Sequence, residues 1–386
     1  MKIPLSAPDI EEEEIQAVAS VLRTPHLSLG PRLEEFERAV ASYVDTGDAI
    51  AVSSGTAGLH LCVRALGIGP GDEVIVPSFA FVAVANAVRY ENAIPVFVDI
   101  EPGTLNVDPK RAEAAITSRT KAILVVHTFG CPVELSQILD IAQRHHLYVI
   151  EDACEAIGAE YDSRKVGSIG DVGVFAFYPN KQITTGEGGA VVTANPRIAS
   201  LVRALRNHGR LNSEDWLQHS ELGYNYRLSE MNCALGISQL NRIESILSRR
   251  EEIARKYAAQ LKENENLRLP ALDLPRRRIS WFVYVVRLSG PWSRAHRDWI
   301  VQEMNRRGIA CGRYFAPIHL QPAYQSIPNF QRASLAVTED QASRTLALPF
   351  FNRLRDEQIE AVCANLGESI QLAGNQLLRS ARGATS

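Results

Sequence analysis

Hydrophobic positions along the chain alternate between short apolar runs and longer segments with helical spacing. Between residues 49 and 193, the short runs are rich in Val, Ile and Ala and predict buried strands, and amphipathic segments between them predict helices. The expected strands cover 48–53, 73–78, 95–100, 121–127, 147–152, 171–178 and 188–193. Strands this apolar, separated by helices, indicate a mostly parallel sheet that helices cover on both faces.

The same spacing predicts helices on both sides of this region and shorter elements after it. The expected helices cover 14–22, 31–44, 56–66, 80–90, 134–146, 196–206 and about 229–263. Beyond residue 263 follow apolar runs at 280–288 and 309–315, a helix through 299–308 and a helical tail.

This order predicts an α/β protein with two domains. We expect an N-terminal segment at 1–14, a large domain at 15–250 and a smaller C-terminal α/β domain at 251–386.

Composition narrows the class of protein. The 386 residues are 46% hydrophobic and 22% charged, and the formal net charge of -3 does not point to nucleic acid or an anionic membrane surface. The six cysteines form no CxxC pair, which suits a reducing compartment without disulfides or zinc. The N-terminus has no apolar signal region, and no apolar run is long enough for a membrane span. A cytoplasmic protein without membrane or nucleic-acid partners is the expectation.

Candidate chemistry lies at the ends of expected strands, where ligands bind in open α/β sheets. The turn SSGTAGLH at 53–60 presents backbone N–H groups at a helix start, which suits a phosphate, although an ordinary N-cap is the commoner explanation. Asp152 follows a buried strand, where a carboxylate needs a partner such as a cationic ring nitrogen. A helix cap or a magnesium ligand is the alternative for Asp152.

Lys181 lies between the apolar strand 171–178 and the glycine-rich turn TTGEGG. These flanks favour an enclosed amine that forms a Schiff base over the commoner surface lysine. Phe79 and Phe81 follow an earlier strand, and either could stack on the planar ring of a ligand. A buried position in the core is an equally good explanation for each of these phenylalanines. A site for pyridoxal 5'-phosphate (PLP) needs four groups, and the chain offers them in order. They are a turn that binds phosphate, an aromatic ring, a carboxylate at a strand end and a later lysine.

Taken together, these segments resemble the DegT/StrS family of sugar aminotransferases. The resemblance rests on SGTAGLHL, GPGDEVIVPSFAFVAVANAV, PVFVDIEPGTLNVD, VIEDACEAIGA, GSIGDVGVFAFYPNKQITTGEGGAVVT, LRNHG, GYNYRLSEMNCALG and RYFAPIHLQPAY, which run in family order from about residue 50 to 325. It implies the aspartate-aminotransferase type fold (PLP fold type I), with a mostly parallel mixed sheet in the large domain.

The resemblance also implies roles for individual residues around the cofactor ring. Lys181 matches the lysine that forms the Schiff base, and Asp152 matches the acid on the pyridine nitrogen. Phe81 matches the stacking aromatic and is therefore preferred to Phe79. Glu155 lies where the family often has glutamine near the ring oxygen.

Other matches concern the cofactor phosphate. Gly55 and Thr56 match the phosphate turn, and Asn225 matches an asparagine that reaches the phosphate of the neighbouring subunit, which implies a homodimer with shared active sites. Many members have serine five residues before the lysine, and this chain has Ala176. We therefore expect one phosphate contact to be absent or replaced, for instance by water.

The resemblance implies transfer of an amino group from L-glutamate to a keto sugar nucleotide, with an NDP-4-keto-6-deoxyhexose as the first expectation. Some relatives have histidine at the position of Lys181 and act as dehydratases. The lysine in this chain therefore favours aminotransfer. Tyr314 and His319 are candidates for the substrate pocket, and a structural turn between the domains is an equal alternative.

The sequence leaves other functions to compare with this one. An NDP-3-keto sugar or a cyclitol ketone is the alternative acceptor. A PLP-binding regulatory protein without turnover is the alternative class, and the chain has no DNA-binding appendage to favour it. An NAD-type dehydrogenase is disfavoured because no GxGxxG follows the first strand.

Overall fold

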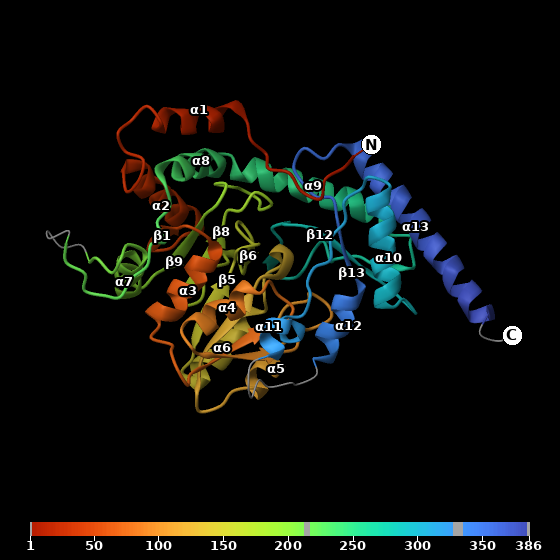
Figure 1. Ribbon diagram of the computed structural model, residues 1–386, viewed down its shortest axis with the longest axis horizontal. Helices are drawn as coiled ribbons and strands as arrows, with labels where there is room; N and C mark the ends of the chain where they lie inside the picture. Colours follow the sequence, from red (N-terminus) through yellow and green to blue (C-terminus); the bar gives the residue numbers. More distant parts are fainter. Residues whose placement is uncertain (1, 212–216, 327–334, 384–386) are drawn as a thin grey trace.

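A central sheet organises the larger part of the molecule (Figure 1). The computed structural model describes residues 2–211, 217–326 and 335–383. The strands of this sheet are β1 (Asp48–Val52), β2 (Glu73–Pro77), β3 (Ile94–Val98), β4 (Thr120–Val126), β5 (Tyr148–Asp152), β8 (Val172–Ala176) and β9 (Gly189–Thr193). They form seven strands in the order β1-β9-β8-β5-β4-β2-β3. Only β9 runs antiparallel to its neighbours, so the predicted mostly parallel mixed sheet is confirmed.

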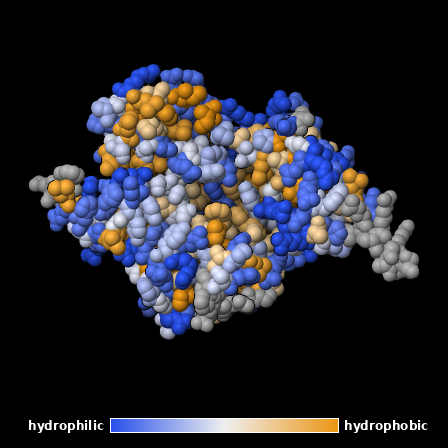
Figure 2. All heavy atoms as spheres, viewed as in Figure 1, coloured by the Kyte–Doolittle hydropathy of each residue, from blue (hydrophilic) through white to orange (hydrophobic). Residues whose placement is uncertain are grey.

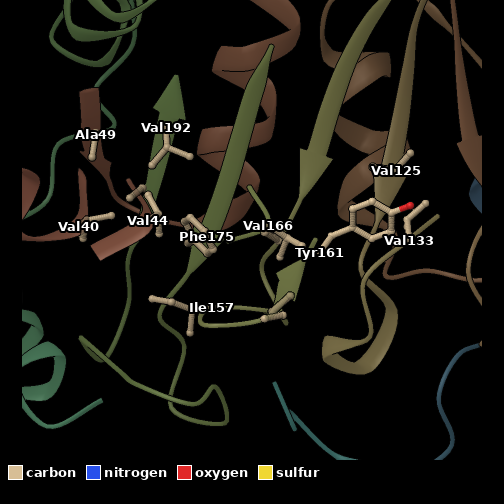
Figure 3. Packing of buried hydrophobic residues seen from close by; sticks show 14 of the residues in the cluster. Val40, Val44, Ala49, Val125, Val133, Ile157, Tyr161, Val166, Phe175 and Val192 are labelled. Atoms are coloured by element: carbon tan, nitrogen blue, oxygen red, sulfur yellow. The ribbon is translucent and has the colours of Figure 1, made fainter. Parts of the chain in front are cut away.

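Helices cover both faces of this sheet. The helices on one face are α3 (Gly55–Ala65), α4 (Ala83–Tyr90) and α7 (Pro196–Arg206). Those on the other are α2 (Pro31–Val44), α5 (Pro109–Ala114), α6 (Leu135–His145) and α8 (Glu230–Asn241). Figure 3 shows part of this second core, where Phe175 and Val192 of the sheet lie near Val44 of α2. Val174 and Val191, one position away, pack on the first face because successive strand residues face opposite sides.

The C-terminal part has its own small sheet and core. Its strands are β10 (Leu267–Arg268), β12 (Tyr284–Leu288) and β13 (Thr345–Leu348), all antiparallel. Its helices are α10 (Arg294–Arg306), α12 (Ala336–Arg344) and α13 (Asp356–Gly383). The predicted helical tail contains α12 and α13, but it missed β13 between them, which pairs with β12. The run at 309–315 forms no strand, and only single residues such as Gly312 bridge to other segments.

The long helix predicted at 229–263 is broken. α8 ends at Asn241, Arg242 leaves the helical conformation, and α9 (Ile243–Leu261) follows. The Arg242 guanidinium lies 2.7 Å from a carboxylate oxygen of Glu14 and 2.9 Å from one of Asp9. These contacts bind the break to α1 (Glu12–Val21) and the segment before it. The spacing of apolar residues within 229–263 cannot predict this break, because the partners of Arg242 lie far away in the sequence.

α9 connects the two cores. Ile246 and Leu247 belong to the core of the large sheet, whereas Ile253 and Tyr257 belong to the core of the C-terminal part. The proposed division at residue 250 therefore falls inside one continuous helix. The division into domains stays a prediction, and the change from one core to the other occurs near this position.

Short elements complete the described structure. They are η1 (Thr128–Gly130), η2 (Ile318–Leu320), α11 (Pro322–Gln325) and a small sheet of β6 (Glu160–Tyr161), β7 (Arg164–Lys165) and β11 (Arg277–Arg278). Within the described ranges, no helix combines the length and apolar character that a membrane crossing requires. No group of three His, Cys, Asp or Glu side chains in these ranges is placed to hold a metal ion.

Candidate active site

Lys181 occupies an enclosed position in the turn that links β8 to β9. Its backbone N–H donates to the carbonyl of Tyr178 at 2.9 Å, which closes a tight turn after the strand. Its side chain is only 13% exposed, and Nζ lies 3.8 Å from a carboxylate oxygen of Glu155. Nζ also lies 4.2 Å from the centre of the Phe282 ring. Lys181 is therefore an enclosed amine and not a solvated surface lysine.

Two carboxyl groups lie at the end of β5 and just after it. Asp152 ends the strand, is 7% exposed and accepts a 3.0 Å hydrogen bond from the N–H of Cys154. Glu155 accepts a 2.9 Å hydrogen bond from the N–H of Phe129. Burial raises the pKa of Glu155, against the opposing effects of Lys181 and of the Phe129 N–H. The site therefore combines one amine with two buried acids.

The turn before α3 offers free donors. The Ser54 side chain caps the helix, whereas the N–H groups of Gly55 and Thr56 have no acceptor among the described residues. A Cβ atom on Gly55 would lie 2.8 Å from both the Cβ of Ala176 and the Sγ of Cys154. Glycine is therefore needed at this close approach. Ala176 lies beside the turn and offers it no hydroxyl.

Aromatic rings surround the amine. Phe282 lies under Lys181, and Tyr314 stacks parallel to Phe282 with ring centres 6.5 Å apart. Phe129, whose N–H holds Glu155, lies 6.3 Å from the Tyr314 ring. Burial raises the pKa of the Tyr314 phenol, and the charge of Glu155 adds to the effect. Sequence reasoning missed Phe282 and Phe129, because each comes from a segment distant in sequence and has no motif of its own.

The two phenylalanines after β2 differ sharply. Phe79 is fully buried and packs edge-on against Phe129 and Phe315. Phe81 is 62% exposed. The structure thus makes Phe79 a core residue and leaves the Phe81 ring available to a ligand.

The residues present fit PLP. The free N–H groups at the start of α3 suit its phosphate, Asp152 suits a cationic ring nitrogen and Lys181 suits its aldehyde. In addition, Oδ1 of Asn180, next to Lys181, is buried and has no hydrogen-bond partner within the described residues. An unsatisfied buried acceptor of this kind points to a missing polar ligand.

The chain matches the DegT/DnrJ/EryC1/StrS aminotransferase family over residues 8–367. It belongs to this family. It is a PLP-dependent sugar aminotransferase of PLP fold type I, and its substrates are an amino donor and a keto sugar. The family and the cofactor that the sequence motifs implied are confirmed.

Similarity to individual relatives extends over almost the whole chain. It is 39% identical to GDP-perosamine synthase of Caulobacter vibrioides over 370 residues, which cover 95% of this chain and 98% of the relative. The structure of S. venezuelae DesV in complex with a ketimine intermediate has a TM-score of 0.87 and 36% identity, with 96% and 98% covered. The PLP-form of Spr1654 from Streptococcus pneumoniae has a TM-score of 0.92 and 28% identity, with 97% and 100% covered.

Within this aminotransferase, the structure separates the two candidates for the substrate pocket. Tyr314 lies in the aromatic group around Lys181. The His319 ring is buried, with Nδ1 2.6 Å from the hydroxyl of Ser78 and Nε2 3.3 Å from a carboxylate oxygen of Glu339. These contacts fix the end of β2 to α12, which favours the structural alternative for His319. Tyr314 remains a candidate for substrate contact.

Asn225 lies on an exposed segment of the aminotransferase. The flanking tyrosines turn inward: the Tyr224 hydroxyl lies 3.0 Å from Glu91, and the Tyr226 hydroxyl lies 3.1 Å from His60. Asn225 itself is exposed. Its side chain is therefore free to meet a second subunit, and its predicted contact across a dimer stays a prediction.

Proposed function

We propose that this aminotransferase moves the amino group of L-glutamate to a nucleotide-linked keto sugar, with an NDP-4-keto-6-deoxyhexose as the acceptor. The single observation that carries the aminotransfer is the enclosed Lys181 amine, 3.8 Å from the buried carboxyl of Glu155. The choice of acceptor is supported by the 39% identity to a GDP-perosamine synthase, whose name denotes an amino sugar linked to a nucleotide.

Different residues would bind different parts of the cofactor. Gly55 and Thr56 would bind its phosphate, Phe81 would stack on its ring, and Glu155 would serve its ring oxygen. Asp152 keeps a proton on the ring nitrogen, which is favourable because a buried carboxylate needs a cationic partner. PLP supplies an aldehyde that binds amines and a ring that accepts electrons.

Lys181 moves the proton. Its Nζ takes the proton from the α-carbon of L-glutamate as a general base and returns it as a general acid. The turn at Tyr178 holds the lysine backbone, and the side-chain Nζ lies 3.8 Å from a carboxylate oxygen of Glu155. The rings of Phe282 and Tyr314 exclude water from the amine. In the second half of the reaction the keto sugar takes the place of the α-keto acid and the same groups act in reverse.

We further propose a homodimer with shared active sites. Exposed Asn225, between two inward-facing tyrosines, is placed to reach a partner. Figure 2 shows hydrophobic residues gathered over the region of α1 and α2. The exposed apolar side chains of α1 and of the segment after it are Ile15, Leu22, Leu27 and Leu29. A second copy of the chain would cover such a surface.

The test is the visible absorption spectrum of the purified protein with PLP, before and after L-glutamate is added. We expect a band of the lysine-bound cofactor that is lost on addition of glutamate and is absent from Lys181→Ala. A band that is indifferent to glutamate and glutamine and persists in Lys181→Ala would overturn the proposal and favour a PLP-binding regulatory protein.

The acceptor is tested after the first half-reaction. The glutamate-treated enzyme is offered NDP-4-keto-6-deoxyhexoses, an NDP-3-keto sugar and a cyclitol ketone, and return of the original band is followed. We expect the fastest return with a 4-keto sugar. Faster return with either of the others would replace the proposed acceptor and leave the aminotransferase assignment intact.

A further inference from the structure

A buried arginine near the active site has no carboxylate beside it. Arg250 lies on α9, between the residues of this helix that belong to the two cores, and it is 3% exposed (Figure 1). Among the described residues its guanidinium contacts only neutral oxygens, and burial lowers its pKa to about 10. A buried charge is costly unless hydrogen bonds compensate for it. The bonds that Arg250 makes are therefore what keeps a charge at this place.

Three oxygens accept hydrogen bonds from Arg250. Its Nε donates to the carbonyl of Trp281 at 2.7 Å, Nη2 to the carbonyl of Phe282 at 3.0 Å, and Nη1 to Oδ1 of Asn352 at 2.8 Å. Nδ2 of Asn352 donates in turn to the carbonyl of Ile246 at 3.1 Å, one turn earlier on α9. The planar guanidinium fork serves several fixed acceptors at once, whereas the ammonium of a lysine is a compact group on a flexible stem.

Two of these acceptors belong to the segment that covers Lys181. The centre of the Phe282 ring lies 4.2 Å from Nζ, and Phe282 is 5% exposed. The start of this segment is fixed to the large domain, since the Ser280 hydroxyl donates to the carbonyl of Ile157 at 2.6 Å. Its other end is fixed by Arg250. The backbone on both sides of the ring is therefore held, and the arginine supplies the second anchor.

We propose that Arg250 is a positioning residue of the active site, which holds the Phe282 backbone so that the Phe282 ring lies over Nζ of Lys181. This inference rests on the proposed role of Lys181 in binding the cofactor and moving the proton. The ring attracts the amine when it is protonated and shields it from water in either state. Arg250 has no ion pair or hydrogen bond with Lys181 among the described contacts, so its effect on the amine passes through the ring.

A second buried arginine shows what a purely structural role looks like. Arg287 on β12 is 4% exposed, and burial lowers its pKa to about 10 as well. It donates to Oε1 of Gln341 at 2.9 Å and to the carbonyl of Pro102. None of these partners belongs to the segment that contacts Lys181. Arg287→Lys is therefore the matched control for Arg250→Lys.

The experiment measures how fast acetic anhydride labels Lys181 in the full-length protein without cofactor, by mass spectrometry of the Lys181 peptide. We expect Arg250→Lys to raise this rate about fivefold, the ratio that corresponds to one lost hydrogen bond. Arg287→Lys should leave it unchanged. Phe282→Leu removes the ring and should raise the rate at least as much. When Phe282→Leu is already present, Arg250→Lys should add nothing, because two residues that act through one contact are not additive.

A second readout separates positioning from a loss of folded protein. In the glutamate half-reaction, Arg250→Lys should lower the limiting rate about tenfold at an unchanged half-saturating concentration of glutamate, because the ring orients the amine that moves the proton. A smaller folded fraction lowers the amplitude of the absorbance change and leaves this rate constant as it is. A changed half-saturating concentration with an unchanged limiting rate would overturn the inference.

The outcomes distinguish this inference from the proposed function. If glutamate bleaches the cofactor band while labelling of Lys181 ignores Arg250→Lys, only the positioning role falls. If glutamate has no effect while Arg250→Lys speeds labelling, the proposed function falls and the positioning of Phe282 over Lys181 stands. An equal rise in Arg287→Lys, or additive effects of Arg250→Lys and Phe282→Leu, would contradict the positioning role. Should Arg250→Lys fail to fold, Asn352→Ala, which removes one of the three acceptors, replaces it: faster labelling supports the role and an unchanged rate overturns it.

Discussion

Glu151 and Asp152 are adjacent at the end of β5, yet their side chains serve opposite sides of the central sheet. Glu151 is fully buried, lies 3.0 Å from Nε2 of His127 and accepts bonds from backbone N–H groups, including those of Gly167 at 2.8 Å and Gly170 at 2.5 Å. Asp152 lies on the side of the cofactor site. The alternation of the strand thus separates a buried, hydrogen-bonded carboxylate from the one that we propose acts on the cofactor.

Glu151→Gln should destabilise the fold. Burial acts to raise the pKa of Glu151, but the bonds from His127 and from the N–H groups of Gly170 and Gly167 outweigh it and lower the pKa. We expect the free energy of unfolding at neutral pH to fall by about 2–4 kcal/mol, since the amide cannot replace the buried carboxylate as the acceptor of all these hydrogen bonds. Urea unfolding measures the change.

The effect should depend on pH with a definite sign. Because the folded-state pKa of Glu151 is lowered, its stabilisation is present above the pKa of an unfolded glutamate, about 4.3, and is lost as the pH falls through the lowered value. The gap between wild type and Glu151→Gln should therefore narrow in acid. The exposed ion pair of Glu113 with Arg144 supplies the control, because Glu113→Gln should change stability little at any pH. Equal losses in both variants would contradict the assignment.

Asp152→Asn should keep the cofactor and lose the reaction. The amide has the shape of the carboxyl but cannot hold the ring nitrogen protonated, so the rate of the glutamate half-reaction should fall by roughly 10²-fold or more. Stopped-flow absorbance gives this rate, and a PLP titration gives the affinity. The matched control is Asp140→Asn on the exposed side of α6, which should leave both unchanged. A half-reaction at the wild-type rate would remove Asp152 from the catalytic residues.

Sequence patterns predicted the elements whose formation depends on neighbouring residues along the chain. The helix expected at 31–44 is α2 (Pro31–Val44), because Pro31 starts it and its apolar positions repeat with helical spacing. The order of the elements likewise predicted that Asp152 ends a strand and that Lys181 is enclosed, and the structure places them so, whereas their catalytic roles stay predictions.

The rest depends on partners far away in sequence. The break at Arg242 follows from contacts with Asp9 and Glu14, which no pattern around the break records. Phe282 reaches Lys181 only because the C-terminal part folds against the large sheet. In the same way, the bond of His319 to Ser78 favours the structural alternative for His319, and no pattern around either residue records it.

Ala176→Ser should tighten PLP binding. The Cβ of Ala176 lies beside Gly55 at the phosphate turn, so a hydroxyl there adds one donor to a charged acceptor. A hydrogen bond to a charged group contributes about 1.5 kcal/mol, and we expect the dissociation constant of PLP to fall about tenfold. Absorbance titration of the cofactor-free protein measures it. Gly55→Ala should have the opposite effect, because its Cβ would meet Ala176 and Cys154 at 2.8 Å. An unchanged affinity in Ala176→Ser would mean that its hydroxyl does not reach the phosphate.

Mixed dimers test whether Asn225 serves the partner's site. Lys181→Ala removes the amine from its own subunit, and Asn225→Asp places a negative charge against the phosphate that this residue contacts. If that phosphate belongs to the partner, a hybrid of the two variants has one site with both defects and one site with neither. Random exchange makes about half of the dimers hybrids, so mixing should restore roughly a quarter of the wild-type activity. Each variant incubated alone should stay inactive at limiting PLP. Failure to recover activity, with hybrid formation shown by mass spectrometry, would mean that Asn225 serves its own subunit and that its exposure has another cause.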